Sequence, residues 1–194
     1  MAEQIKNQNT RPIRRKVNEL TSQAEIETCL RTVRTGYLGL QDNEGMYVVP
    51  LNFIWHNGSL YFHGSSEGRK TDALTQQEAP VCFTVVEDWG TIADPVPAHT
   101  STAYRSVMVF GYPEKVESLK EATEALQAML GKYVPGYYSG ALASSHVDKY
   151  RSSLGSPTSV YRITPLRLTG KVNPVCPEQM FYPGRTIQDD RKME

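Results

Sequence analysis

Hydrophobic residues recur at helical spacing in two separate segments of the chain. Ser22 and Glu25 fit a capping box ahead of the first segment, and Gly36 follows its last apolar position. This pattern predicts a helix over residues 21–35. A second apolar face predicts a helix over residues 119–133. The residues that define the two faces are Ile26, Cys29, Leu30 and Val33 in the first helix, and Leu119, Ala122, Leu126, Met129, Leu130 and Tyr133 in the second.

Elsewhere the apolar pattern has the period of two that is typical of strands. Strands are predicted at residues 37–40, 46–55, 59–63, 81–86, 104–112 and 159–172, the last of them bent near Pro165. Asn57 and Gly58 predict a type I′ hairpin, because both residues readily adopt positive φ angles. The apolar residues of 81–86 indicate burial on both faces of that strand. The proline-rich residues 88–103 are expected to form a loop.

Two shorter helices are predicted, one ending near Gln76 and one around residues 141–150. The resulting order of elements favours antiparallel hairpins over a doubly wound parallel sheet. We therefore predict a mainly β fold with peripheral helices, in which a closed or split antiparallel barrel removes the exposed sheet edges. Residues 21–172 form this domain, between a flexible basic arm at 1–20 and an irregular tail at 173–194.

Composition and charge restrict the partners of this domain. The chain has 194 residues, of which 39% are hydrophobic and 22% charged, as in ordinary globular proteins. Its 21 Lys and Arg residues balance 21 Asp and Glu residues, so no general attraction to nucleic acid or to a membrane surface is expected. Three widely spaced cysteines, with no secretory signal and no membrane-spanning apolar run, favour a reducing, cytoplasmic location.

One segment places basic residues where a helix begins. It consists of His63, Gly64, Ser65 and Ser66 at the end of a strand, followed by Arg69 and Lys70 in the first turn of a short helix. Cations at this end oppose the helix dipole, and a phosphate bound between them and the free amides would explain their presence. The alternative is a solvated turn with incidental basic residues, and the pattern alone favours neither interpretation.

Four pieces of the chain, in order, resemble the pyridoxamine 5′-phosphate oxidase-like FMN-binding split barrels, especially the branch of nitroimidazole-resistance proteins. The pieces are residues 36–40 after the first helix, 47–53, 57–65 with 68–70 and 73–74, and 104–111. The resemblance covers about residues 20–170. It implies an antiparallel split barrel that forms a homodimer and binds flavin mononucleotide (FMN) at the subunit interface.

The resemblance also implies the positions of the cofactor. The flavin ring would lie along Val49, Pro50, Leu51 and Asn52, and the ribityl-phosphate path would follow His63, Gly64, Ser65 and Ser66 to Arg69 and Lys70. Tyr104, Arg105 and Ser106 would contact the cofactor from the adjacent strand or from the other subunit. A proline in an apolar strand indicates an edge or a bulge, where backbone groups remain free for a ligand, although a simple kink is the alternative.

The activity implied is that of an oxidoreductase in which FMN passes electrons from NADH or NADPH to a small planar acceptor, such as a nitroaromatic. No dinucleotide-binding fingerprint is present, so the nicotinamide is expected to bind transiently. No catalytic residue is identified, and His63 is a weak candidate for proton transfer. The tail at 177–185 does not resemble the C-terminal segment, containing Trp and Arg, with which pyridoxamine phosphate oxidases hold the phosphate of their substrate, so this substrate is not expected.

Other functions remain open at the level of sequence. The protein could store or sense a flavin, a deazaflavin or a haem without catalysis, with His63 as a haem ligand. It could also be a dimeric scaffold that binds no ligand. A metal site is not expected, because no second histidine or carboxylate lies at ligand spacing from His63.

Overall fold

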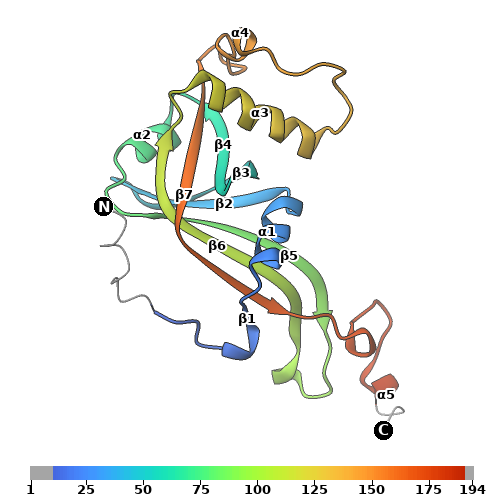
Figure 1. The fold of residues 1–194 in the computed structure, drawn as a ribbon. Coiled ribbons are helices and arrows are strands. Elements are labelled where there is room, and N and C mark those ends of the chain that lie inside the picture. Colours follow the sequence, from blue (N-terminus) through green and yellow to red (C-terminus); the bar gives the residue numbers. More distant parts are fainter. Residues whose placement is uncertain (1–10, 191–194) are drawn as a thin grey trace.

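The computed structural model describes residues 11–190 and confirms the predicted antiparallel barrel with peripheral helices (Figure 1). Residues 1–10, half of the predicted basic arm, lie outside the described residues. The strands are β1 (Glu19–Leu20), β2 (Thr35–Asp42), β3 (Gly45–His56), β4 (Ser59–Ser65), β5 (Val81–Ile92), β6 (Ser101–Lys115) and β7 (Thr158–Asn173). The α-helices are α1 (Gln23–Thr32), α2 (Arg69–Thr75), α3 (Leu119–Tyr133), α4 (Ser144–Val147) and α5 (Ile187–Asp190).

The barrel closes because β7 pairs with strands on both of its sides. The sheet order is β1-β7-β4-β3-β2-β5-β6, and β6 pairs again with β7 along its length. Closure pairs most strand edges and so limits edge-to-edge association, although the two-residue strand β1 pairs only with β7 and part of β3 stays unpaired on one side. The interior is filled by apolar side chains that are fully buried, including Leu38, Phe53, Phe62, Phe83 and Val109.

Local sequence signals account for the first helix and the central hairpin. The Ser22 hydroxyl accepts a hydrogen bond from the amide of Glu25, which confirms the predicted cap of α1. Asn57 and Gly58 have φ angles of 48° and 74°, as a type I′ turn requires. The predicted end of α1 at residue 35 was wrong. The helix ends at Thr32, and Gly36 belongs to β2 instead of stopping the helix. A β-carbon there would stand 2.0 Å from the ring of Phe83, so close packing requires this glycine.

Two predictions for the β5–β6 region were also wrong. The loop is shorter than the predicted 88–103 and spans only residues 93–100, because β5 continues to Ile92 and β6 begins at Ser101. A bulge between Asp88 and Gly90, where Gly90 has a φ of 109°, lets the hairpin continue. Strand β5 is not buried on both faces either. Only its inward positions are buried, while Val86 on the outward face is 44% exposed, because a barrel strand has one inner face.

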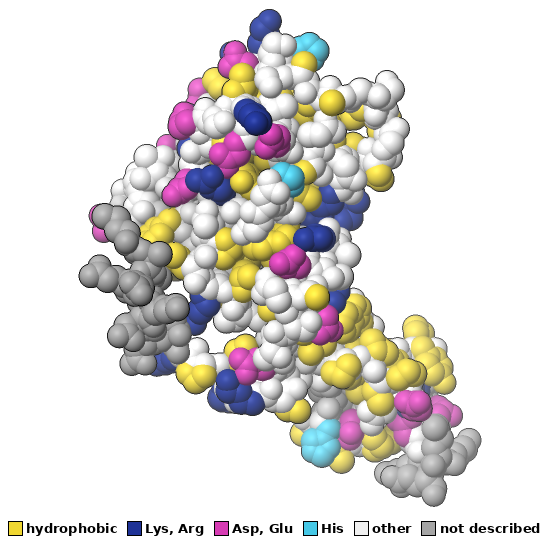
Figure 2. Space-filling view, viewed as in Figure 1, with side chains coloured by type: hydrophobic (Ala, Val, Ile, Leu, Met, Phe, Trp, Pro, Cys, Tyr) yellow, Lys and Arg dark blue, Asp and Glu magenta, His cyan; other side chains and the backbone are white. Residues whose placement is uncertain are grey.

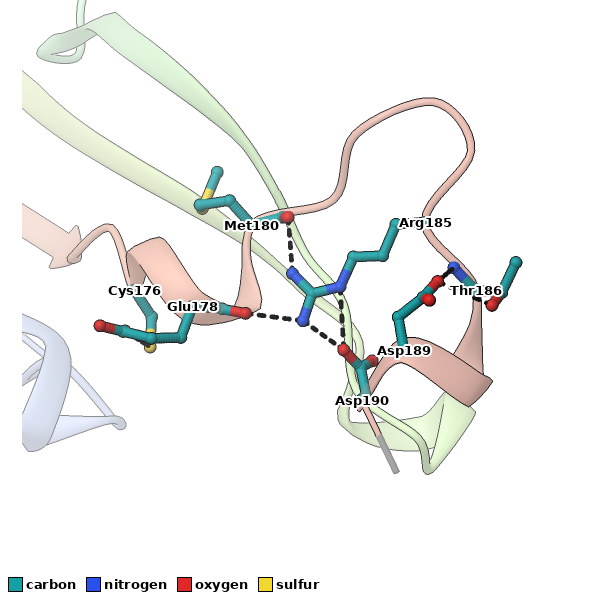
Figure 3. A network of polar contacts seen from close by, with 7 residues as sticks. All are labelled: Cys176, Glu178, Met180, Arg185, Thr186, Asp189 and Asp190. Carbon is teal, nitrogen blue, oxygen red and sulfur yellow. Dashed lines mark hydrogen bonds and ion pairs between the residues drawn. The ribbon is translucent and has the colours of Figure 1, made fainter. Parts of the chain in front are cut away.

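The C-terminal segment packs on the β5–β6 hairpin. The amide of Ala93 donates to the carbonyl of Gln179, and the amide of Phe181 donates to the carbonyl of Thr91, both at 2.8 Å. The Arg185 guanidinium closes this segment on itself (Figure 3). It pairs with Asp190 and donates to the carbonyls of Glu178 and Met180 at 2.6 and 2.7 Å. Figure 2 shows hydrophobic side chains gathered over this end of the molecule. Exposed apolar residues of the β5–β6 connection and the C-terminal segment are Val96, Val175, Phe181 and Tyr182.

Among the described residues, no helix has the length and apolar character needed to cross a membrane.

Candidate functional site

Strands β3 and β4 separate partway along their length. They pair only between His56–Ser59 and Phe53–Phe62. Beyond Phe53, β3 continues beside β2, whereas β4 turns away and pairs with β7, with His63 opposite Val160 (Figure 1). Within the described residues, no strand pairs with the side of β3 that β4 leaves. This divergence, which we call the split, leaves residues 45–52 with an open backbone edge.

The two predicted halves of the site lie on the two sides of the split. Val49, Pro50, Leu51 and Asn52 lie on the open edge of β3. His63, Gly64 and Ser65 lie on β4, immediately after it leaves β3. Pro50 therefore lies at a strand edge, as expected for a residue that has no backbone N–H to donate. Sequence reasoning about both segments thus leads to one place in the fold.

Lys70 lies over β4 at Gly64. A β-carbon on Gly64 would stand 1.8 Å from the Lys70 Nζ, so the absence of a side chain at position 64 makes room for the ammonium. The Nζ also lies 6.0 Å from the centre of the Tyr161 ring. Burial alone lowers the pKa of Lys70, and no ion pair of this lysine occurs within the described part of the chain. A half-buried cation without a carboxylate is suited to bind an anion.

His63 lies beside this cation. Part of its side chain reaches solvent, yet the surrounding protein lowers the pKa of His63 by desolvation, and the charge of Lys70 lowers it further. An anion bound here would oppose both effects, because a nearby negative charge favours the protonated form of a base. In the protein alone, this corner therefore has basic groups whose protonated forms are disfavoured, and an anion would stabilise them.

Arg69 points elsewhere. Its guanidinium donates to both carboxylate oxygens of Asp42, with Nε–Oδ2 at 2.6 Å and Nη2–Oδ1 at 3.0 Å. It also lies 3.4 Å from Glu44 and 4.6 Å from the centre of the Tyr47 ring. The hydrogen bond from Arg69 lowers the pKa of Asp42. Arg69 thus ties α2 to the β2–β3 turn, and its predicted contact with a phosphate stays a prediction.

Ser65 and Ser66 form a corner that is held by hydrogen bonds. The Ser65 Oγ accepts from the amide of Glu67 at 3.0 Å and lies 2.7 Å from the Oγ of Ser156. The amide of Ser66 donates to the carbonyl of Pro157 at 2.8 Å. Gly68 follows with a φ of 97° and provides no side-chain cap for α2. The corner is therefore ordered by the protein before any ligand binds.

Tyr104, Arg105 and Ser106 lie far from this corner within one chain. Arg105 pairs with Val172 on β7, whereas His63 pairs with Val160. At about 3.3 Å per residue, these positions are roughly 40 Å apart along β7. The Arg105 guanidinium is engaged by Glu87 at 2.6 Å and is only 14% exposed. Across the sheet they lie nearer to the other half of the site. Val107, the next residue on β6, pairs with Val85, which pairs with Gly36, which in turn pairs with Leu51, so three strand spacings separate this part of β6 from the open edge of β3.

Lys132 and Tyr133 were not predicted as site residues. The Tyr133 hydroxyl accepts from the amide of Phe53 at 2.9 Å and donates to the carbonyl of Arg34. The Lys132 Nζ donates to the carbonyl of Phe53 at 3.1 Å and lies 3.7 Å from the centre of its ring. Burial, helped by Arg34, lowers the pKa of Lys132 to about 8. The last turn of α3 thereby holds β3 at the point where the split begins.

Sequence comparison places most of the chain in one known group. A family model described as pyridoxamine 5′-phosphate oxidase matches residues 22–172. None of the curated proteins matches the chain.

Solved structures share the fold. A flavocytochrome from Azotobacter vinelandii superposes with a TM-score of 0.71 at 22% identity, covering 91% of this chain and 80% of that one. A candidate 5-nitroimidazole antibiotic resistance protein from Bacteroides thetaiotaomicron gives 0.63 at 26% identity, covering 79% and 86%. An FAD- and haem-binding protein from Mycobacterium smegmatis gives 0.67 at 18% identity, covering 90% and 80%. At 22% and 18% identity, the first and third establish a common fold and no more.

Proposed function

The chain belongs to the pyridoxamine 5′-phosphate oxidase family, and we propose that it binds FMN in the split between β3 and β4 as a redox cofactor. Electrons would pass from NADH or NADPH to a small planar acceptor, such as a nitroaromatic. The observation that carries the proposal is the half-buried ammonium of Lys70, which has no carboxylate partner within residues 11–190 and lies over Gly64, on the strand that leaves β3 at the split.

The Lys70 side of the split fits a phosphate. A charge-assisted hydrogen bond to a phosphate oxygen would restore the stabilisation that the ammonium loses on burial. His63 could add a second donor once the anion raises its pKa. Riboflavin lacks the phosphate, so it should bind more weakly than FMN.

The open edge of β3 fits the polar side of a flavin ring. Backbone groups of residues 49–52 that face away from β2 have no strand partner within the described residues and can hydrogen-bond to ring nitrogen and oxygen atoms. When bound, a flavin supplies hydride-transfer chemistry that side chains do not provide. The residues of this chain would hold the ring, orient it and limit its contact with water. His63, whose pKa is lowered by desolvation and by Lys70 and would be raised by a bound anion, could accept or return a proton beside it.

We further propose that two copies of the chain associate. The outer faces of β2, β3, β5 and β6 carry exposed apolar side chains, including Tyr37, Met46, Val48, Val86 and Met108 at 41–75% exposure. A monomer seldom exposes so many apolar groups on adjoining strands unless they meet a partner. Such a dimer could bring Arg105 of one copy toward the split of the other.

A second candidate is a non-catalytic protein that stores or senses a flavin or a haem. It is kept because the similar solved structures include a flavocytochrome and an FAD- and haem-binding protein. His63 would be the residue to test as a haem ligand, since part of its side chain reaches solvent at the split.

The test begins with the absorbance spectrum of the purified protein and mass identification of any released ligand. Flavin absorption with an FMN mass supports the proposal, whereas a haem spectrum supports the second candidate. Anaerobic mixing with NADH or NADPH should then bleach the flavin absorption. A protein that stays colourless after incubation with FMN contradicts cofactor binding, and a flavin that neither donor reduces contradicts the enzymatic role.

A further inference from the structure

Residues 151–157 form a small loop that packs against the Ser65–Ser66 corner from outside the split. This loop precedes β7, and its residue Ser156 lies 91 positions after Ser65 in the sequence. It makes two contacts with the corner. The Pro157 carbonyl accepts from the amide of Ser66 at 2.8 Å, and the Oγ of Ser156 lies 2.7 Å from that of Ser65.

The loop is held in shape by its own hydrogen bonds. The amide of Ser152 donates to the carbonyl of Ser156 at 2.7 Å, and the amide of Gly155 donates to the carbonyl of Ser152 at 2.9 Å. Gly155 has a φ of 88°, which favours glycine there. Ser156 is consequently only 8% exposed, and its hydroxyl has partners on both sides. A buried serine in this setting acts as a fixed support rather than a solvated side chain.

The three serine hydroxyls form a chain whose direction can reverse. Ser152 and Ser65 each lie 2.7 Å from Ser156, and either oxygen of each pair could be the donor. Each hydroxyl has one proton to donate. If the bonds run from Ser152 through Ser156 to Ser65, the proton of Ser65 remains free for a ligand. If they run the other way, Ser65 donates its proton to the Oγ of Ser156, and that proton is not available to a ligand.

We propose that Ser156 is a positioning residue for the phosphate of the bound flavin: its hydroxyl holds the Ser65 corner in place and leaves the Ser65 proton free for an anion. This inference rests on the proposed function, because it assumes that the corner receives a phosphate. An anion favours the chain direction in which Ser65 donates outward, since only that direction supplies it with a proton. The loop would thus prepare the corner before binding, which reduces the ordering cost of the ligand.

The experiment compares the binding of FMN and riboflavin by the full chain and by Ser156→Ala, using quenching of flavin fluorescence. We expect the variant to bind FMN about tenfold more weakly, because the Ser65 hydroxyl loses the hydrogen bond that holds it toward the phosphate, with riboflavin affinity unchanged. Ser153→Ala, in the same loop but exposed, is the matched control and should bind both ligands as the wild type does. An equal loss for both ligands, or no loss, overturns the inference.

A second variant protects the test against misfolding. Ser65→Ala should show the same selective loss, and the double variant should lose no more than either single one, because both substitutions interrupt one chain. Additive losses would overturn the proposed link. If the wild type binds neither FMN nor riboflavin, the proposed function fails, and this inference fails with it. If the wild type binds FMN and Ser156→Ala binds it equally well, only the inference about Ser156 fails.

Discussion

The ammonium of Lys70 occupies the space above Gly64 that a side chain would otherwise fill. A β-carbon at position 64 would stand 1.8 Å from the Lys70 Nζ, well inside van der Waals contact. The atom in the way is the end of a flexible side chain, so the lysine rather than the backbone would have to move. Gly64, which has no side chain, thereby determines where the ammonium of the proposed phosphate site lies.

Gly64→Ala should weaken FMN binding with little effect on folding. The new methyl group displaces the Lys70 ammonium, and the phosphate loses a charge-assisted hydrogen bond, which corresponds to about a tenfold or greater rise in Kd. Fluorescence titration and thermal unfolding measure the two effects separately. Gly131→Ala is the control, because a β-carbon there meets no atom within 4 Å. Unchanged FMN affinity in Gly64→Ala would mean that Lys70 does not contact the phosphate from this position.

Lys70→Met and Arg69→Met should differ in their effects. Loss of Lys70 should weaken FMN binding by about 10- to 100-fold and make the remaining binding less sensitive to salt, since the main cation is gone. Loss of Arg69 should mainly loosen the β2–β3 turn, where Asp42 loses its partner. Titration at two salt concentrations, with thermal unfolding of the apoprotein, distinguishes the roles. A larger loss of affinity in Arg69→Met would show that Arg69 leaves Asp42 to bind the phosphate.

Lys132 should make unfolding stability depend on pH. Its pKa falls from 10.5 to about 8 in the folded state, so between these values the unfolded chain binds more protons and stability rises with pH. The slope should be smaller than the ~1.4 kcal/mol per pH unit of one fully released proton, because solvent screens the half-buried ammonium. Urea unfolding from pH 7 to 10.5 of the wild type and Lys132→Met isolates this contribution. Parallel curves for the two proteins would exclude it.

Arg185→Met should release the C-terminal segment and leave the barrel intact. The substitution removes the donors to the carbonyls of Glu178 and Met180 and leaves Asp190 without its partner (Figure 3). Hydrogen exchange should accelerate over residues 176–190 and stay unchanged in β2–β4. Lys171→Met, a basic residue on the nearby strand β7, serves as control. Equal protection of the tail in both variants would show that the backbone contacts of Ala93 and Phe181 suffice to hold it.

Local order in this protein could be predicted from the sequence. The apolar face of α3, the Ser22 cap and the Asn57–Gly58 turn each depend on residues a few positions apart, and each was predicted correctly. The order of the predicted elements also indicated the antiparallel barrel, and family resemblance added the candidate segments on β3 and β4. Errors arose where tertiary contacts overruled local signals, as when Gly36 served close packing in β2 rather than ending a helix.

The arrangement of side chains around the split was decided only by the tertiary structure. Arg69 and Lys70 are neighbours in sequence, yet one pairs with Asp42 and the other lies over Gly64. Lys132 and Ser156 act on strands that are distant in sequence, at Phe53 and Ser65. Backbone preferences depend on residues a few positions apart, so they produce a pattern that can be recognised in the sequence. These contacts depend on the closure of the whole barrel, so they produce no such local pattern.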